Sequence, residues 1–169
     1  PNSAVDHHVA AIGVPTGYWR SGAHSYNCFF VESFLDELAH AAEQDAVSFR
    51  MAMLGGETRL ARCVQMAAQL GGWQGGQPGS GQGIACHAFR GSYVAVMAEA
   101  RLDGRKVKVE RLVAAVDCGR VVNPDLVTQQ IEGGLLFGMA AALAGSTGFT
   151  ENVADVRDLS ELGLPTLAD

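Results

Sequence analysis

Apolar residues in the first half of the chain recur at intervals of three and four positions, which is typical of amphipathic helices. We predict three helices, over residues 25–42, 45–54 and 57–70. Asp45 is placed to cap the second helix, and Gly71 is placed to end the third in a left-handed conformation. The predicted apolar positions are Phe30, Phe34, Leu35, Leu38 and Ala42 in the first helix, and Leu60, Cys63, Val64, Ala67 and Leu70 in the third. In the first helix, Glu32, Asp36, Glu37 and His40 lie mostly off this face.

A β pattern begins after residue 83. Residues 84–89, 93–102 and 106–116 are short segments with the composition of strands. Asp103-Gly104 stands between the last two, and this dipeptide is a strong signal for a tight hairpin. We therefore expect a small, mainly antiparallel sheet.

A further helix is predicted from the cap residue Asn123 to about Leu143, with Pro124 at its favoured first position. Three glycines, Gly133, Gly134 and Gly138, lie inside it. Each costs about 1 kcal/mol relative to alanine in a helix interior. We therefore expect another backbone or a flat ligand to pack closely against this helix.

The segment between the two halves, residues 71–83, contains seven glycines and one proline. We interpret it as a flexible connector; the alternative, a phosphate-cradling loop, lacks a lysine and a clear following helix. Residues 1–70 then form a lead-in, with a short strand over 9–12, a loop and the helical segment. Residues 84–169 form the hairpin, the long helix and the C-terminal tail of the same domain. The predicted class is α+β: a helical first half, a small mainly antiparallel sheet and a long Gly-containing helix packed on it.

Composition narrows the classes of function. The 169 residues carry a net charge of −6, and no basic cluster suggests a nucleic-acid partner. The four cysteines are far apart and form no CxxC pair, which disfavours a zinc or iron–sulfur site. They could form two disulfides, but the spacing does not require it, and free thiols are the commoner case. No uninterrupted apolar run reaches 18 residues.

His24 is the one histidine in a candidate functional loop, and its simplest interpretation is a hydrogen bond at a helix start.

Two long segments, with the hairpin between them, indicate a family. The first runs from Trp19 to His24 and continues as SYNCFFVESFLDELAHAAEQD. The second is VAAVDCGRVVNPDLVTQQIEGGLLFGMAAAL, residues 113–143. Together they resemble the molybdopterin-binding large subunit of the xanthine dehydrogenase and aldehyde oxidoreductase family, and are most similar to isoquinoline 1-oxidoreductase β subunits. A strand ending in DCG, then NP, then QxEGG on a helix is a long joint pattern and hence specific.

The resemblance implies a molybdenum hydroxylase, which oxidises aldehydes or N-heterocycles with oxygen taken from water. It implies molybdopterin as cofactor, and an iron–sulfur subunit and the remainder of the large subunit as partners. It also implies that the glutamate base and the first cofactor loop lie outside this chain. We therefore expect an internal fragment that is inactive alone and binds no cofactor by itself. A non-catalytic scaffolding or protein-interaction domain derived from the same fold is the alternative.

The same resemblance suggests which residues form the site. Arg20 matches a family arginine beside cofactor and substrate, where a guanidinium can stabilise developing negative charge. The other candidates for cofactor binding are Trp19, Ser21, Gly22, Ala23, Gln130, Gly133 and Gly134, and Gln129 remains an alternative to Gln130. The loop RSGAH is less Gly-rich than that of xanthine-oxidising members, so purine specificity is not carried over.

Two structural roles and one surface property are also expected. Asp117 and Asn123 should hold the strand-to-helix turn through side-chain-to-backbone hydrogen bonds. If the chain is part of a larger subunit, apolar surface should be exposed around Phe29, Phe30 and the glycine face near Gly134, and the chain should tend to self-associate.

Overall fold

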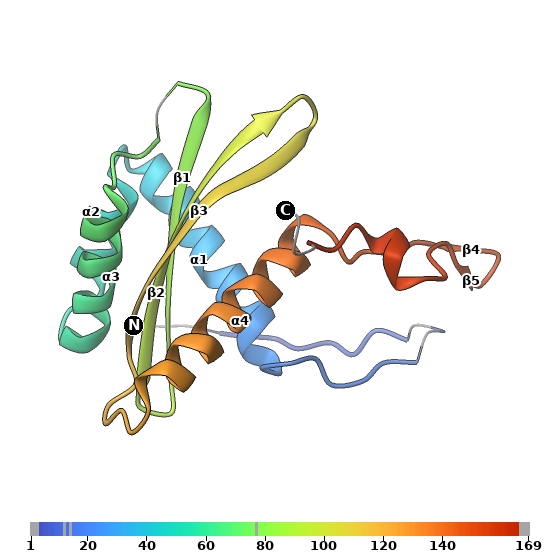
Figure 1. The fold of residues 1–169 in the computed structure, drawn as a ribbon, viewed down its shortest axis with the longest axis horizontal. Coiled ribbons are helices and arrows are strands. Elements are labelled where there is room, and N and C mark those ends of the chain that lie inside the picture. The colour runs from blue at the N-terminus through green and yellow to red at the C-terminus, as the bar shows by residue number, and fades with distance from the viewer. Residues whose placement is uncertain (1–3, 12, 14, 77, 166–169) are drawn as a thin grey trace.

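The computed structural model describes residues 4–11, 13, 15–76 and 78–165. The elements are α1 (Ala23–Ala41), α2 (Ala46–Met53), α3 (Thr58–Gly71), β1 (Ser80–Phe89), β2 (Ser92–Asp103), β3 (Lys106–Asp117), α4 (Pro124–Leu143), β4 (Phe149–Thr150), β5 (Val153–Ala154) and a 3-10 turn η1 (Leu159–Leu162). Figure 1 shows α2 and α3 on one side of the three long strands, with α4 and the terminal segments on the other side of the view. The predicted α+β class is confirmed.

The sheet is an antiparallel meander in the order β1-β2-β3. Arg90 and Gly91 join β1 to β2, and both have positive φ, as the tightest hairpin turns require. Asp103 pairs with Lys106, so the second hairpin turns where its sequence signal predicted. Strand β1 begins at Ser80, four positions before the predicted start at 84. The pairing thus extends the sheet into the Gly-rich segment.

Helix α3 lies against all three strands and forms the core with them. Leu60, Cys63, Val64 and Ala67 are buried as predicted, against residues of β1 and β2 that include Ile84 and Met97. Leu70 is 61% exposed, so that position was predicted wrongly. Gly71 is buried instead, and a β-carbon there would collide with the thioether of Met97. Helix α3 therefore turns a small residue toward the sheet at its last position.

Gly72, not Gly71, ends α3 in the left-handed conformation, one residue later than predicted. The following Trp73 donates from its indole Nε1 to the Asp45 carboxylate at 2.6 Å. Asp45 also caps α2, as predicted, by accepting from the Ser48 N–H. The described part of the Gly-rich connector is thus attached to the start of α2.

A buried ion pair links α1, α2 and β1. The Arg50 guanidinium, on α2, donates through Nε to the Glu32 carboxylate at 2.9 Å and through Nη2 to the Glu32 carbonyl at 3.0 Å. The same carboxylate accepts from the backbone N–H of Cys86 at 3.0 Å. Arg50 is 1% exposed and Glu32 7%. Asp36 completes the cluster with a 2.7 Å contact to Arg50.

This cluster rotates α1 away from its predicted orientation. Glu32, placed off the apolar face by the sequence pattern, is buried. Phe30, Phe34 and Leu38, placed on it, are 61%, 57% and 37% exposed. The helix turns Glu32 inward, on the same side as the half-buried Leu35 and the buried Ala39, because Arg50 on α2 offers a buried partner there. Its aromatic side, including Phe29, remains on the surface, as was expected around Phe29 and Phe30.

Helix α4 has the predicted start, since the Asn123 side chain accepts a hydrogen bond from the Leu126 N–H at 3.1 Å. None of its residues is buried, so it does not pack on the sheet as expected. A β-carbon at Gly133, Gly134 or Gly138 would meet no atom within 4 Å, so the described chain supplies no backbone packed against these glycines. By length and composition alone, α4 could also cross a membrane.

At the ends of the chain the structure is mostly irregular. Residues 4–11 contain no strand. The predicted strand over 9–12 is therefore absent as far as residue 11, and its last residue lies outside the described part. After α4, the two short strands β4 and β5 pair with each other and η1 follows.

Asp117 joins the end of β3 to α3. Its carboxylate receives two hydrogen bonds from Arg59, at 2.8 and 2.6 Å, and one from the Gly119 N–H at 3.1 Å. The last of these is the predicted turn-stabilising bond. The Arg59 guanidinium holds the pKa of Asp117 at about 2, well below its usual value. The ionised form of Asp117 is therefore favoured in the folded chain.

Replacing Arg50 by leucine should lower the free energy of unfolding by about 3–5 kcal/mol, because the Glu32 carboxylate stays buried without its partner. Urea denaturation measures the change. Glu37→Gln, at an exposed position of the same helix, should alter stability by less than about 0.5 kcal/mol. Equal effects of the two substitutions would contradict a stabilising role for the pair.

Asp117→Asn should show a stability deficit that depends on pH. The folded pKa of Asp117 is lowered to about 2, so its stabilising contribution is complete above about pH 4, the usual aspartate pKa, and disappears as pH falls toward 2. Denaturation curves of wild type and variant should converge over that window. Arg59→Gln should remove the same pH-dependent part of the stability. A loss of stability in Asp117→Asn that is as large at pH 2 as at neutral pH would argue against the ion pair.

Candidate functional site

The loop before α1 is a tight turn built on two left-handed residues. Ser21 has φ 70° and Gly22 has φ 57°, and the Gly22 N–H donates to the Trp19 carbonyl at 2.9 Å. Helix α1 then begins at Ala23, and no side chain caps its first turn. The first turn also contains no acidic residue. Backbone N–H groups at such a helix start favour an anion.

The same loop touches α4 through aromatic contacts. The Arg20 guanidinium carbon lies 5.0 Å from the centre of the Phe137 ring, and the Trp19 ring lies 5.3 Å from it. Phe137 follows Gln130 by seven residues, Gly133 by four and Gly134 by three. In an α-helix these spacings place all four residues on one face. The structure therefore brings the two groups of predicted site residues to the same part of the surface.

This shared surface is open. Trp19 is 56% exposed; Arg20, Gln130 and Gly133 are exposed, and Gly134 is half-buried. The missing β-carbons of the two glycines leave the backbone of α4 bare on that face. Helical geometry also puts Gln130, rather than Gln129, in line with Phe137. The arrangement offers an amide, a guanidinium and backbone donors around a flat strip without side chains.

Sequence reasoning did not find the neighbours of His24. Its Nδ1 lies 2.9 Å from Nε2 of His87 on β1, and its ring centre is 4.1 Å from that of Phe89. Burial, followed by the charge of His24, lowers the pKa of His87. The side chain of His24 thus bonds to the sheet, whereas the simple expectation was a bond at its own helix start. No local pattern reveals a contact across 63 positions; Phe137, by contrast, was discoverable from its spacing to Gln130.

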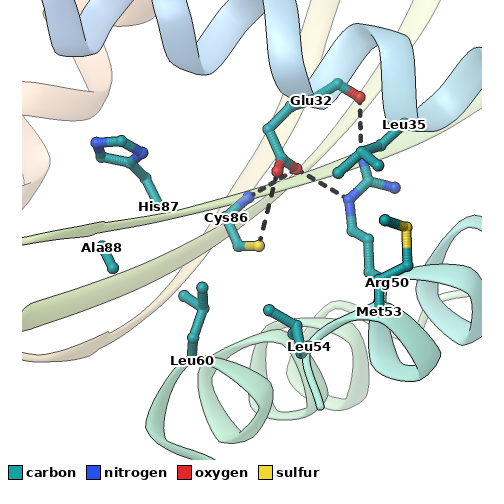
Figure 2. Close-up of a pocket in the computed structure, with 9 residues that line it drawn as sticks. All are labelled: Glu32, Leu35, Arg50, Met53, Leu54, Leu60, Cys86, His87 and Ala88. Atoms are coloured by element: carbon teal, nitrogen blue, oxygen red, sulfur yellow. Dashed lines mark hydrogen bonds and ion pairs between the residues drawn. The ribbon is translucent and has the colours of Figure 1, made fainter. Parts of the chain in front are cut away.

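Two hollows lie near the sheet, and neither is lined by the predicted site residues. Figure 2 shows the smaller, of about 170 Å³, with the Glu32–Arg50 pair and Cys86 on its wall. Burial, together with the Glu32 carboxylate, raises the pKa of Cys86 to about 12. That thiol therefore stays protonated and packs in the hydrophobic core. The other hollow, of about 430 Å³, lies between α3 and the end of β3, beside Arg59 and Asp117.

The side chains of the described residues do not by themselves form a site for a metal ion. Across the described residues, no group of three or more His, Cys, Asp or Glu is placed to hold a metal ion. The four cysteines are all free. The donor set at the Trp19–Ala23 loop and the α4 face instead fits an organic anion with polar edges, such as a pterin carrying phosphate.

Comparison with known proteins gives the family. A family model described as a molybdopterin cofactor-binding domain matches residues 34–169. This range contains the α4 face and begins after the Trp19–Ala23 loop. No solved structure matches the chain.

Three curated proteins are similar. The β subunit of isoquinoline 1-oxidoreductase from Brevundimonas diminuta is 33% identical over 68% of this chain and 16% of its own length. A nicotinate dehydrogenase subunit from Pseudomonas putida is 30% identical, over 79% of this chain and 13% of its own. A membrane-bound aldehyde dehydrogenase from Gluconacetobacter polyoxogenes, whose name specifies pyrroloquinoline quinone, is 28% identical over 90% of this chain and 23% of its own length.

The chain thus spans less than a quarter of the length of each of these relatives. The resemblance inferred from the DCG, NP and QxEGG pattern is confirmed by the family model, which covers most of the chain. This chain belongs to the molybdopterin cofactor-binding domain family.

Proposed function

We propose that this chain forms part of the wall of a molybdopterin site in the large subunit of a molybdenum hydroxylase that oxidises aldehydes or N-heterocycles with water as oxygen source. The single observation that supports it most is the contact of Trp19 and Arg20 with Phe137. This contact joins the loop and the helix face on which the family resemblance placed its cofactor residues. The names of the relatives supply the class of substrate.

Each residue has a distinct task in this proposal. The N–H groups at Ser21, Gly22 and Ala23 bind the anionic part of the cofactor at the start of α1. Gln130 bonds a pterin edge, because its amide both donates and accepts. Gly133 and Gly134 let the flat ring approach the helix backbone. Arg20 is the catalytic residue, since its guanidinium stabilises negative charge that develops on the substrate.

Molybdopterin, when bound, supplies the two-electron oxidation, and an iron–sulfur subunit is the proposed acceptor of the electrons. The proton-abstracting glutamate is assigned to a part of the large subunit outside this chain. We therefore propose that this chain is inactive alone and binds cofactor only with the rest of its subunit. The bare face of α4 and the exposed phenylalanines of α1 are the surfaces that this remainder would cover.

Gln130→Ala in the full-length subunit should reduce retained molybdenum and pterin by about 10-fold or more, the effect of losing hydrogen bonds to a charged ligand. Metal analysis and pterin fluorescence after oxidation give the two contents. Gln129→Ala is the matched control, since it removes the same amide one position away. Equal losses in both variants would argue that the amides support the helix rather than the cofactor. Full cofactor content in the Gln130 variant, with stable protein, would favour the scaffolding alternative.

Gly133→Ala should separate the stability of the chain from its cofactor function. In a helix interior with no atom within 4 Å of the new β-carbon, alanine should stabilise the chain by up to about 1 kcal/mol. The full-length subunit carrying it should nevertheless retain less cofactor, because the methyl group occupies the flat strip. Gly138→Ala lies farther round the helix from Gln130 and should stabilise without this loss. Unchanged cofactor content in both variants would contradict a role for the glycine strip.

A further inference from the structure

The His24–His87 pair is the one side-chain hydrogen bond in the described chain that ties the first turn of α1 to the sheet. The other side-chain bonds at the loop are local: Ser21 Oγ donates to the Arg20 carbonyl and Ser25 Oγ donates to the Gly22 carbonyl. One turn later, the Cys28 thiol makes a weak contact with the Cys86 carbonyl at 3.9 Å. The imidazole pair, together with the packing of the His24 ring on Phe89, therefore holds the first turn of α1 against β1.

We propose that the hydrogen bond between His24 Nδ1 and His87 Nε2 is a proton-sensitive tether that positions the Trp19–Ala23 loop for its anionic ligand. His87 is thus a positioning residue, which acts through His24. The inference rests on the proposed function for the identity of the ligand, but the tether itself is a property of this chain.

The bond has a simple proton requirement. One ring nitrogen must donate and the other must accept, so at least one of the two rings has to be neutral. A single added proton leaves one donor and one acceptor in place. A second proton removes the acceptor and puts two positive charges 2.9 Å apart. The tether should therefore hold at neutral pH and open in acid, below the usual imidazole pKa.

The groups around the pair favour this response. Burial and the proximity of His24 lower the pKa of His87, and Glu32 on α1 acts in the opposite direction. Arg90 follows β1, and its guanidinium lies over Phe89, the ring that packs on His24. Cys28 and Cys86 have raised pKa values and stay neutral. Opening of the pair would release the loop from β1 while the core, built on α3, stays folded.

Hydrogen–deuterium exchange with mass spectrometry tests the tether in the full-length subunit, on peptides covering residues 19–28, at pH 7.5 and pH 5. After correction for intrinsic rates, wild type should exchange about fivefold faster at pH 5, the change expected for the loss of one ordinary hydrogen bond. His87→Leu should exchange at the faster rate at both pH values. His87→Gln, whose amide can bond to His24 without titrating, should stay protected at both. His40→Gln, at an exposed position of the same helix, should behave as wild type.

A wild-type loop whose protection is independent of pH, or a His87→Gln variant with the full wild-type pH response, would overturn the proposal. The second result remains decisive if His87→Leu fails to fold. The exchange readout does not require cofactor, so it succeeds or fails independently of the proposed function. Molybdenum content of the same variants separates the two: faster exchange with undiminished cofactor content in His87→Leu would reject the positioning role.

Discussion

The fold depends on a buried carboxylate that three elements share. Glu32 accepts from the Arg50 side chain on α2 and from the Cys86 backbone on β1. A charge in such a place is tolerated only when it is fully paired, and here its partners come from separate parts of the chain. The pair therefore fixes how α1 lies on the rest of the molecule. Because it fixes α1, it also decides which side of that helix faces outward.

The outward side is aromatic, and it shares the surface with a helix, α4, that buries none of its residues. A monomeric protein rarely exposes apolar surface of this kind without a partner for it. The chain spans less than a quarter of the length of each of the three relatives, and in the proposed function the rest of a larger subunit covers this surface. In the chain itself, the Trp19–Ala23 loop that precedes α1 touches α4 at Phe137.

The sequence predicted the elements well because their signals are local. Asp45 and Asn123 cap their helices, and the Asp103-Gly104 hairpin lies where its residues require it. Orientation was predicted less well, because periodicity alone cannot show that Arg50 would draw Glu32 inward. Family resemblance assigned Gln130, Gly133 and Gly134 to the site, and it also supplied Arg20, which lies far from them in the chain. The His24–His87 contact had no sequence signal at all.

The positive φ angles of Ser21 and Gly22 restrict the side chains that this turn can carry. Positive φ is accessible to glycine and tolerated by a few small polar residues, but it is costly for β-branched ones. The backbone of the turn is therefore held to one shape by a narrow choice of side chains at two positions. The neighbouring position 20 is free of that restriction. A turn of this design keeps the backbone N–H groups in place whatever side chain stands at position 20.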